Sequence, residues 1–205
     1  MKLYIMRHGE TDWNKEKRIQ GNTDIPLNAY GEELARITAE GLKDTRFDYI
    51  FSSPLMRAYR TAEIVRGSRN VEIVTDARLI EMSFGSYEGT TKDERPADCE
   101  LGTFFKHPEL YVPDNDAETI DSIIARAGAF LDEKIYPLEA VNPDCNILIA
   151  GHGALNKALM TCLINLERKD YWGGAVQKNC SIAIYEISGG KATLLEDGVI
   201  FYECV

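Results

Sequence analysis

The segment Met1–Asn14, MKLYIMRHGETDWN, changes abruptly from an apolar run to polar residues. Residues 2–6 predict a short buried strand, and Arg7, His8 and Gly9 follow it directly. Because glycine has no side chain, a histidine beside it at the end of a strand has little steric cover. The segment therefore predicts an imidazole that a ligand can reach.

A second segment repeats this pattern. Residues 146–150 are another apolar run, followed by Gly151, His152 and Gly153, so two of the chain's three histidines end predicted strands. In open α/β sheets, ligands bind beyond the carboxyl ends of the parallel strands. We therefore expect His8 and His152 to meet at one site.

The composition is that of an ordinary globular protein, with 44% hydrophobic and 27% charged residues among 205. We expect a single domain over residues 1–205, with an excursion or lid at about 90–116. The formal net charge of −10 argues against nucleic acid and against an anionic membrane as partners. A small anionic substrate remains compatible with this charge, because a few clustered arginines can reverse the potential inside one cleft.

Targeting and redox features predict a cytoplasmic protein. The amino-terminal apolar run is too short for a signal peptide, and no run approaches the length of a membrane span. The cysteines lack a C-x-x-C pair, so we expect reduced thiols rather than a disulfide framework or a zinc site. They are Cys99, Cys145, Cys162, Cys180 and Cys204.

Predicted strands and helices alternate along most of the chain, after a long loop at 7–29. Ser53 before Pro54 is typical of a helix start, with Ser53 as the cap and Pro54 as the first helical residue. The alternation predicts an α/β fold with a largely parallel sheet covered by helices on both faces. We expect strands at residues 2–6, 48–51, 71–74, 146–150, 182–187 and 192–202, and helices at 30–43, 54–66, 101–106, 118–139 and 154–166.

Five residues near the predicted strand ends form a candidate phosphate site: Arg7, His8, Arg57, Glu81 and His152. Arginine forks match the oxygens of a tetrahedral dianion. A neutral imidazole can attack phosphorus near neutral pH and form a phosphohistidine. Glu81 is the candidate acid that protonates the leaving alkoxide.

These residues also have other interpretations. Arg57 and Arg60 lie one helical turn apart, and their spacing does not choose between them. Two histidines and a glutamate suggest a metal site, but the adjacent arginine would repel a cation. His107, inside the 90–116 segment, is most simply an exposed loop residue.

Four blocks of residues together resemble a known family, the histidine phosphatase family, also called the phosphoglycerate mutase-like superfamily. The resemblance is specific, keeps the family's block order and runs from residue 1 to about 165. The blocks are Arg7-His8-Gly9-Glu10-Thr11 with Trp13-Asn14, Arg18-Ile19-Gln20-Gly21, Asp24-Ile25-Pro26-Leu27 and Gly31; Ser52-Ser53-Pro54-Leu55-Met56-Arg57-Ala58 with Thr61-Ala62; Glu81 with Phe84-Gly85 and Glu88-Gly89; and Gly151-His152-Gly153.

The resemblance implies a three-layer α/β/α sandwich with a mostly parallel, mixed sheet, and an enzyme that uses no metal and no other cofactor. It implies that His8 is the phosphorylated nucleophile, and it selects Arg57 over Arg60. The remaining implied roles are a phosphate clamp of Arg7, Arg57 and His152, a proton donor in Glu81, and substrate neighbours in Asn14, Gln20, Gly21 and Gly153.

Departures from the mutase pattern favour a phosphatase that acts on a small phosphomonoester. Residues 88–118 hold nine acidic and three basic residues, whereas the insertion of the mutases carries additional basic residues. Met-Ser-Phe-Gly follows Glu81 in place of Arg-His-Tyr-Gly, and Ala-Leu follows Gly153 in place of Asn-Ser. A phosphoglycerate mutase is the alternative, and a non-catalytic phospholigand-binding regulator is a third reading.

Residues 90–116 are expected to form much of the wall that selects the substrate. Their acidity predicts poor acceptance of substrates with a second strongly anionic group. The sequence defines the substrate only as a small phosphorylated metabolite, and it leaves a homodimer open.

Overall fold

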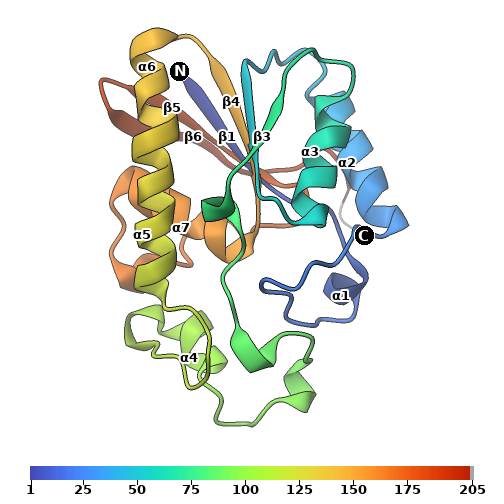
Figure 1. Ribbon diagram of the computed structural model, residues 1–205, viewed down its shortest axis with the longest axis vertical. Helices are drawn as coiled ribbons and strands as arrows, with labels where there is room; N and C mark the ends of the chain where they lie inside the picture. Colours follow the sequence, from blue (N-terminus) through green and yellow to red (C-terminus); the bar gives the residue numbers. More distant parts are fainter. Residues whose placement is uncertain (204–205) are drawn as a thin grey trace.

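The computed structural model describes residues 1–203 and is built on one six-stranded sheet (Figure 1). The strand order is β3-β2-β4-β1-β5-β6. The first four strands in this order are parallel, and β5 and β6 run antiparallel to their neighbours, so the sheet is mixed. The strands are β1 (Lys2–Arg7), β2 (Tyr49–Ser52), β3 (Ile73–Thr75), β4 (Asn146–Gly151), β5 (Ile182–Ser188) and β6 (Lys191–Val199).

Helices cover both faces of this sheet. In Figure 1, α2 and α3 lie on one side, and α5, α6 and α7 lie on the other. The predicted three-layer α/β/α fold is therefore confirmed. The α-helices are α1 (Asp12–Lys15), α2 (Ala29–Gly41), α3 (Met56–Arg66), α4 (Leu101–Lys106), α5 (Ile120–Phe130), α6 (Tyr136–Val141) and α7 (Gly153–Ile164).

Alternate residues of β1 enter different halves of the core. Leu3 and Ile5 belong to one apolar cluster with Phe130 of α5, whereas Tyr4 and Met6 belong to a second cluster on the α3 side. Side chains alternate between the faces of a strand, so a strand covered on both faces reads as a continuous apolar run. The unbroken run of the amino terminus thus follows from a central position in the sheet.

The predicted start of α3 was wrong. The helix begins at Met56, with Leu55 as its cap residue, and Ser53 and Pro54 remain outside it. The Ser53 N–H donates to the Ala150 carbonyl at 3.0 Å, which extends the β2–β4 pairing past the strand end. The carboxylate of Asp24 accepts from the Met56 N–H at 2.7 Å. A residue from the long loop therefore supplies the contact expected from Ser53.

The helix predicted over 118–139 is interrupted. It begins after Thr119, whose hydroxyl accepts from the Ser122 N–H, and a π turn at Leu131–Ile135 separates α5 from α6. Pro137 follows this turn and has no N–H to donate to the helical ladder, so the hydrogen-bond register changes just before it. Two predicted strands were also misplaced, since β3 starts at Ile73 and β6 ends at Val199.

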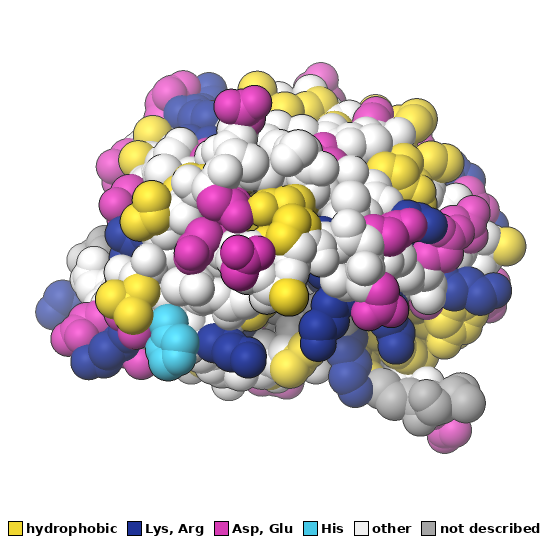
Figure 2. Space-filling view, turned by 90° about the horizontal axis from the view of Figure 1, so that it is seen from below, with side chains coloured by type: hydrophobic (Ala, Val, Ile, Leu, Met, Phe, Trp, Pro, Cys, Tyr) yellow, Lys and Arg dark blue, Asp and Glu magenta, His cyan; other side chains and the backbone are white. Residues whose placement is uncertain are grey.

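The 90–116 segment is attached to the main core. It contains the short helix predicted at 101–106, and Leu101, Phe104 and Tyr111 are buried in the same apolar cluster as β1 and α5. Its acidic side chains are mostly exposed, and Figure 2 shows acidic groups on the outer surface of the face seen from below. The segment therefore directs its charge toward solvent.

Within residues 1–203, no helix is long and apolar enough to cross a membrane. The described cysteines are free thiols, namely Cys99, Cys145, Cys162 and Cys180. Cys204, for which a reduced thiol is also predicted, lies outside the described residues.

Candidate active site

The β1–β4 pairing brings the two strand-end histidines together. Arg7 lies opposite Gly151 in the register of these parallel strands, and the His8 N–H donates to the Gly151 carbonyl at 3.0 Å. The His8 and His152 ring centroids are 5.2 Å apart. The two imidazoles therefore share one site, as the repeated sequence pattern predicts.

His8 is buried, and its ring is fixed by its own backbone. Nδ1 lies 2.6 Å from the carbonyl oxygen of Gly9, and because a carbonyl only accepts, Nδ1 carries the proton. The lone pair is then on Nε2. Burial, followed by the charges of Arg57 and Arg7, lowers the pKa of His8 well below its ordinary value. The ring is thus neutral and nucleophilic at neutral pH.

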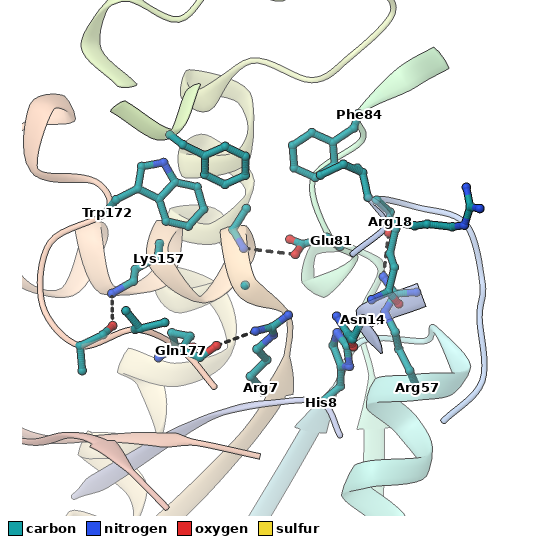
Figure 3. A pocket seen from close by; sticks show the side chains of 18 residues that line it. Arg7, His8, Asn14, Arg18, Arg57, Glu81, Phe84, Lys157, Trp172 and Gln177 are labelled. Carbon is teal, nitrogen blue, oxygen red and sulfur yellow. Dashed lines mark hydrogen bonds between the residues drawn. The ribbon is translucent and has the colours of Figure 1, made fainter. Parts of the chain in front are cut away.

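Both predicted arginines point into the site from opposite sides (Figure 3). Arg7 Nη1 donates to the Gln177 carbonyl at 2.6 Å, and Arg57 donates to the carbonyls of Gly21 and Thr23 at 2.7 and 2.8 Å. The Nε of each arginine is buried and has no protein partner. Burial lowers the pKa of Arg57 to about 10, so it remains a cation at neutral pH.

Arg60, the alternative to Arg57, lies outside the site. Its side chain is half exposed and pairs with Glu32 and Glu63 on the surface. Arg57 is fully buried among the residues that line the cavity. The structure thus brings Arg57, and not Arg60, to the two histidines.

His152 is fully buried at the cap position of α7, and neither of its ring nitrogens has a protein partner. Burial, followed by the charges of Arg57, His8 and Arg7, lowers its pKa well below the ordinary value. Buried polar groups in proteins are normally hydrogen-bonded, so the single N–H of this neutral ring points to a ligand with an acceptor oxygen.

Glu81 reaches the site from the segment after β3. Its carboxylate accepts three backbone N–H bonds, from Met82 at 2.9 Å, from Leu155 at 2.9 Å and from Ala154 at 3.1 Å. The last two donors belong to the first turn of α7, the helix that His152 caps. Figure 3 shows the carboxylate above Arg7 and His8, facing the first turn of α7.

The four predicted substrate neighbours also lie at the cavity. Asn14 is held at the cavity by a capping box with Thr11 at the start of α1. Gln20 is buried, and its side-chain oxygen has no partner. Gly21 has φ of 53°, which favours glycine, and its carbonyl accepts from Arg57. Gly153 opens α7 beneath Glu81 and Arg7, where an added Cβ would make only ordinary contacts.

Glu88 has a structural role that the motif alone did not reveal. Its carboxylate accepts from the N–H groups of Asn22, Thr23 and Phe84 and from the Thr23 hydroxyl, at 2.6 to 3.0 Å. It thereby fixes the loop whose carbonyls hold Arg57. A carboxylate that organises a loop leaves no periodic signal in the sequence.

A cavity of about 420 Å³ opens above these residues. Within the described chain, the 90–116 segment contributes only Phe105 to its lining, and none of that segment's acidic residues reaches it. The prediction that this segment forms much of the wall was therefore wrong. The sequence reasoning missed most of the wall, which consists of Arg18, Ile19, Phe84, Phe105, Ala154, Lys157, Trp172, Ala175, Val176 and Gln177.

Two buried arginines and two neutral imidazoles lie around one point at the carboxyl edge of an α/β sheet, where their donors match the oxygens of a phosphate group. The sequence profile of the histidine phosphatase superfamily (branch 1) matches residues 3–198. The chain belongs to the histidine phosphatase superfamily.

Known proteins of this superfamily are similar over much of the chain. The uncharacterized phosphatase PhoE of Bacillus subtilis is 38% identical over 157 residues, 77% of this chain and 74% of that protein. A solved phosphoserine phosphatase mutant from Entamoeba histolytica, in complex with phosphoserine, is 30% identical with a TM-score of 0.81 over 96% of both chains. The probable phosphoglycerate mutase GpmB of Escherichia coli O1:K1 is 44% identical over 88 residues, 43% of this chain and 41% of that protein.

Proposed function

We propose that this protein is a phosphatase that hydrolyses a small phosphomonoester through a phosphohistidine on His8. The observation that carries the proposal is the buried His8 ring, whose Nδ1–H is held by the Gly9 carbonyl between two arginines. Similarity to named phosphatases over most of the chain supports the reaction class. The unpartnered nitrogens of Arg7, Arg57 and His152 support a tetrahedral anion as the bound group.

In the first step, the Nε2 lone pair of His8 attacks phosphorus, and the bond from phosphorus to the ester oxygen breaks. Arg7, Arg57 and His152 hold the non-bridging oxygens. The leaving alkoxide takes a proton from Glu81, so the alcohol departs neutral.

In the second step, water attacks the phosphorus of the phosphohistidine while Glu81 accepts its proton. The nitrogen–phosphorus bond breaks, and the electron pair returns to Nε2 of His8. Inorganic phosphate leaves, and both side chains are back in their starting states.

The reaction as proposed needs no metal ion. The two arginines and the imidazoles supply the positive charge and hydrogen-bond donors that a divalent cation would otherwise provide. We also propose that the enzyme works below neutral pH, as acid-type phosphatases do. The lowered pKa of His8 keeps the nucleophile unprotonated into mildly acidic solution.

The test is turnover of an aryl phosphate in EDTA by wild-type protein and by His8→Ala. We expect the variant to lose at least about 10³-fold in kcat, because it lacks the nucleophile. His107→Ala changes an exposed histidine outside the cavity and serves as the matched control. Rapid quenching should trap acid-labile, base-stable phosphate on His8. No turnover on a wide phosphomonoester panel would refute the proposal.

A phosphoglycerate mutase is the second candidate, favoured by the similarity to GpmB over less than half of either chain. Transfer from 2,3-bisphosphoglycerate to monophosphoglycerate, measured beside hydrolysis of the same donor, separates the two activities. We expect hydrolysis to be faster. The third reading, a non-catalytic phospholigand-binding regulator, is disfavoured because both His8 and Glu81 are present at the cavity.

We further propose a cytoplasmic location, supported by the free thiols of the described residues. The homodimer stays a prediction, and sedimentation of the purified protein tests it directly.

A further inference from the structure

The cavity above the phosphate site has an apolar upper half. Trp172 and Phe84 lie on its two sides in Figure 3. Phe105 packs against Trp172, and Ile19 and Val176 also line the cavity. The polar residues Arg7, His8, Arg57 and Glu81 are gathered at its floor. A phosphate held at the floor therefore directs the remainder of the molecule between apolar side chains.

The two cations of the wall are already bonded within the protein. Lys157 donates to the carbonyls of Gly173 and Ala175 at 2.6 and 3.0 Å. Arg18 pairs with Glu16 and Glu94 at 2.7 and 2.9 Å. In Figure 3 the Arg18 guanidinium extends away from His8 and Glu81. Two of the three Lys157 donors are therefore used inside the protein, and the Arg18 charge is already offset by two carboxylates.

The aromatic side chains are held in place and offer ring surface. The indole N–H of Trp172 donates to the Phe104 carbonyl at 2.7 Å, so its single donor is occupied. Trp172 and Phe105 pack with ring centroids 5.3 Å apart. The Phe84 ring meets Phe104 edge-on at 5.5 Å. Fixed rings of this kind favour flat apolar groups over hydroxylated ones.

Two apolar side chains at the cavity are unusually exposed. Phe105 is 49% exposed and Val176 is 79% exposed, although each lines the cavity. Exposed apolar surface beside a polar site is favourable to cover with an apolar ligand. These contacts suit an apolar part of the substrate.

We infer that the substrate of this phosphatase has an uncharged, apolar leaving group, with a flat aromatic ring fitting best. The inference rests on the proposed function. Phosphomonoesters whose alcohol carries a carboxylate are then poor substrates, because apolar side chains would displace water from that charge without offering it a partner. A substrate with a second anionic group is therefore disfavoured by the apolar side chains and the occupied cations of the cavity wall. The acidity of residues 90–116 is not the reason.

The first experiment compares kcat/KM for benzyl phosphate, 4-carboxybenzyl phosphate and glycerol 3-phosphate. The alcohols are all primary, so leaving-group reactivity differs little, and the first two differ mainly in one carboxylate. We expect benzyl phosphate to exceed each of the others by at least about tenfold.

A charge-introducing variant tests the position of the apolar half. Val176→Lys places an ammonium at the mouth of the cavity, on a side chain too exposed to disturb the core. It should raise kcat/KM for 4-carboxybenzyl phosphate at least about fivefold and lower it for benzyl phosphate. Val112→Lys is the control, since Val112 is 69% exposed but does not line the cavity. It should match wild type on both substrates.

Equal efficiency on benzyl and 4-carboxybenzyl phosphate, or no difference between the two lysine variants, would overturn the inference and leave the phosphatase proposal intact. Failure of wild-type protein to hydrolyse all three esters and every member of the wide phosphomonoester panel would instead contradict the proposed function.

Discussion

Gly9 and Gly31 pack backbone against backbone directly behind His8. A Cβ placed on Gly9 would lie 2.5 Å from the Gly31 carbonyl oxygen, and one on Gly31 would lie 2.0 Å from the Glu10 carbonyl oxygen. The Gly31 N–H also donates to the side chain of Asn28, the cap of α2. The first turn of α2 therefore supports the backbone that positions the nucleophile.

Gly31→Ala should destabilise the protein by roughly 2 kcal/mol and lower kcat/KM. Alanine forms helices better than glycine by about 1 kcal/mol. Here, however, its methyl group would overlap backbone atoms of Glu10, so the backbone at 9–10 would have to shift. Urea unfolding and aryl phosphate hydrolysis measure the two effects. Gly102→Ala in α4 is the control, because its Cβ would meet nothing within 4 Å. Wild-type stability in Gly31→Ala would contradict the packing argument.

Arg57→Lys should lower kcat/KM for an aryl phosphate by about 10²-fold. Lysine keeps the charge but loses the planar fork, and with it a bidentate grip on the phosphate oxygens. It also loses one of the bonds to the Gly21 and Thr23 carbonyls. Arg60→Lys, one helical turn away on the surface, should retain wild-type kinetics. Similar losses in both variants would show that the two arginines had been assigned incorrectly.

The two histidines at the floor of the site were predictable because each follows a local rule. His8 and His152 end apolar runs that must become parallel strands, and parallel strands end at the same sheet edge. Arg57 needed the family resemblance, since one helical turn separates it from Arg60 and spacing alone treats both alike.

The wall was not predictable in the same way. Lys157 lies on the buried face of α7 and reads as an ordinary helical residue, yet it holds the 173–175 carbonyls. Trp172 and Val176 come from a connection without periodicity, and Phe105 reaches the cavity only because Phe104 anchors α4 in the core. Such placements depend on long-range packing, which leaves little trace in neighbouring residues.

Stability should fall as the pH drops below about 6.5. Burial lowers the pKa of His8 and of His152 in the folded protein, whereas unfolded histidines titrate near 6.5. Below pH 6.5 the unfolded chain therefore binds more protons than the folded protein. The free energy of unfolding keeps its full value above pH 6.5 and declines below it. Each group contributes up to about 1.4 kcal/mol per pH unit.

Urea unfolding at pH 7.5, 6.5 and 5.5 measures this dependence. We expect a loss of about 1–2 kcal/mol over the last interval. His152→Gln removes one of the two titrating groups and should show roughly half the loss. His107→Gln, on the surface, should follow wild type. A free energy of unfolding that stays constant from 7.5 to 5.5 would contradict the assignment of two buried neutral imidazoles.

Glu81→Gln should separate the two chemical steps. Glutamine can neither protonate the alkoxide nor accept a proton from water, so hydrolysis of benzyl phosphate should fall by about 10²–10⁴-fold. The 4-nitrophenolate ion needs no proton to leave, so phosphorylation of His8 by 4-nitrophenyl phosphate should stay fast while the second step becomes slow. Stopped-flow absorbance should then show a burst of one 4-nitrophenolate per active site. Glu109→Gln, an exposed carboxylate outside the cavity, should behave as wild type. A uniform loss on both esters without a burst would mean that Glu81 positions α7 rather than transferring the proton.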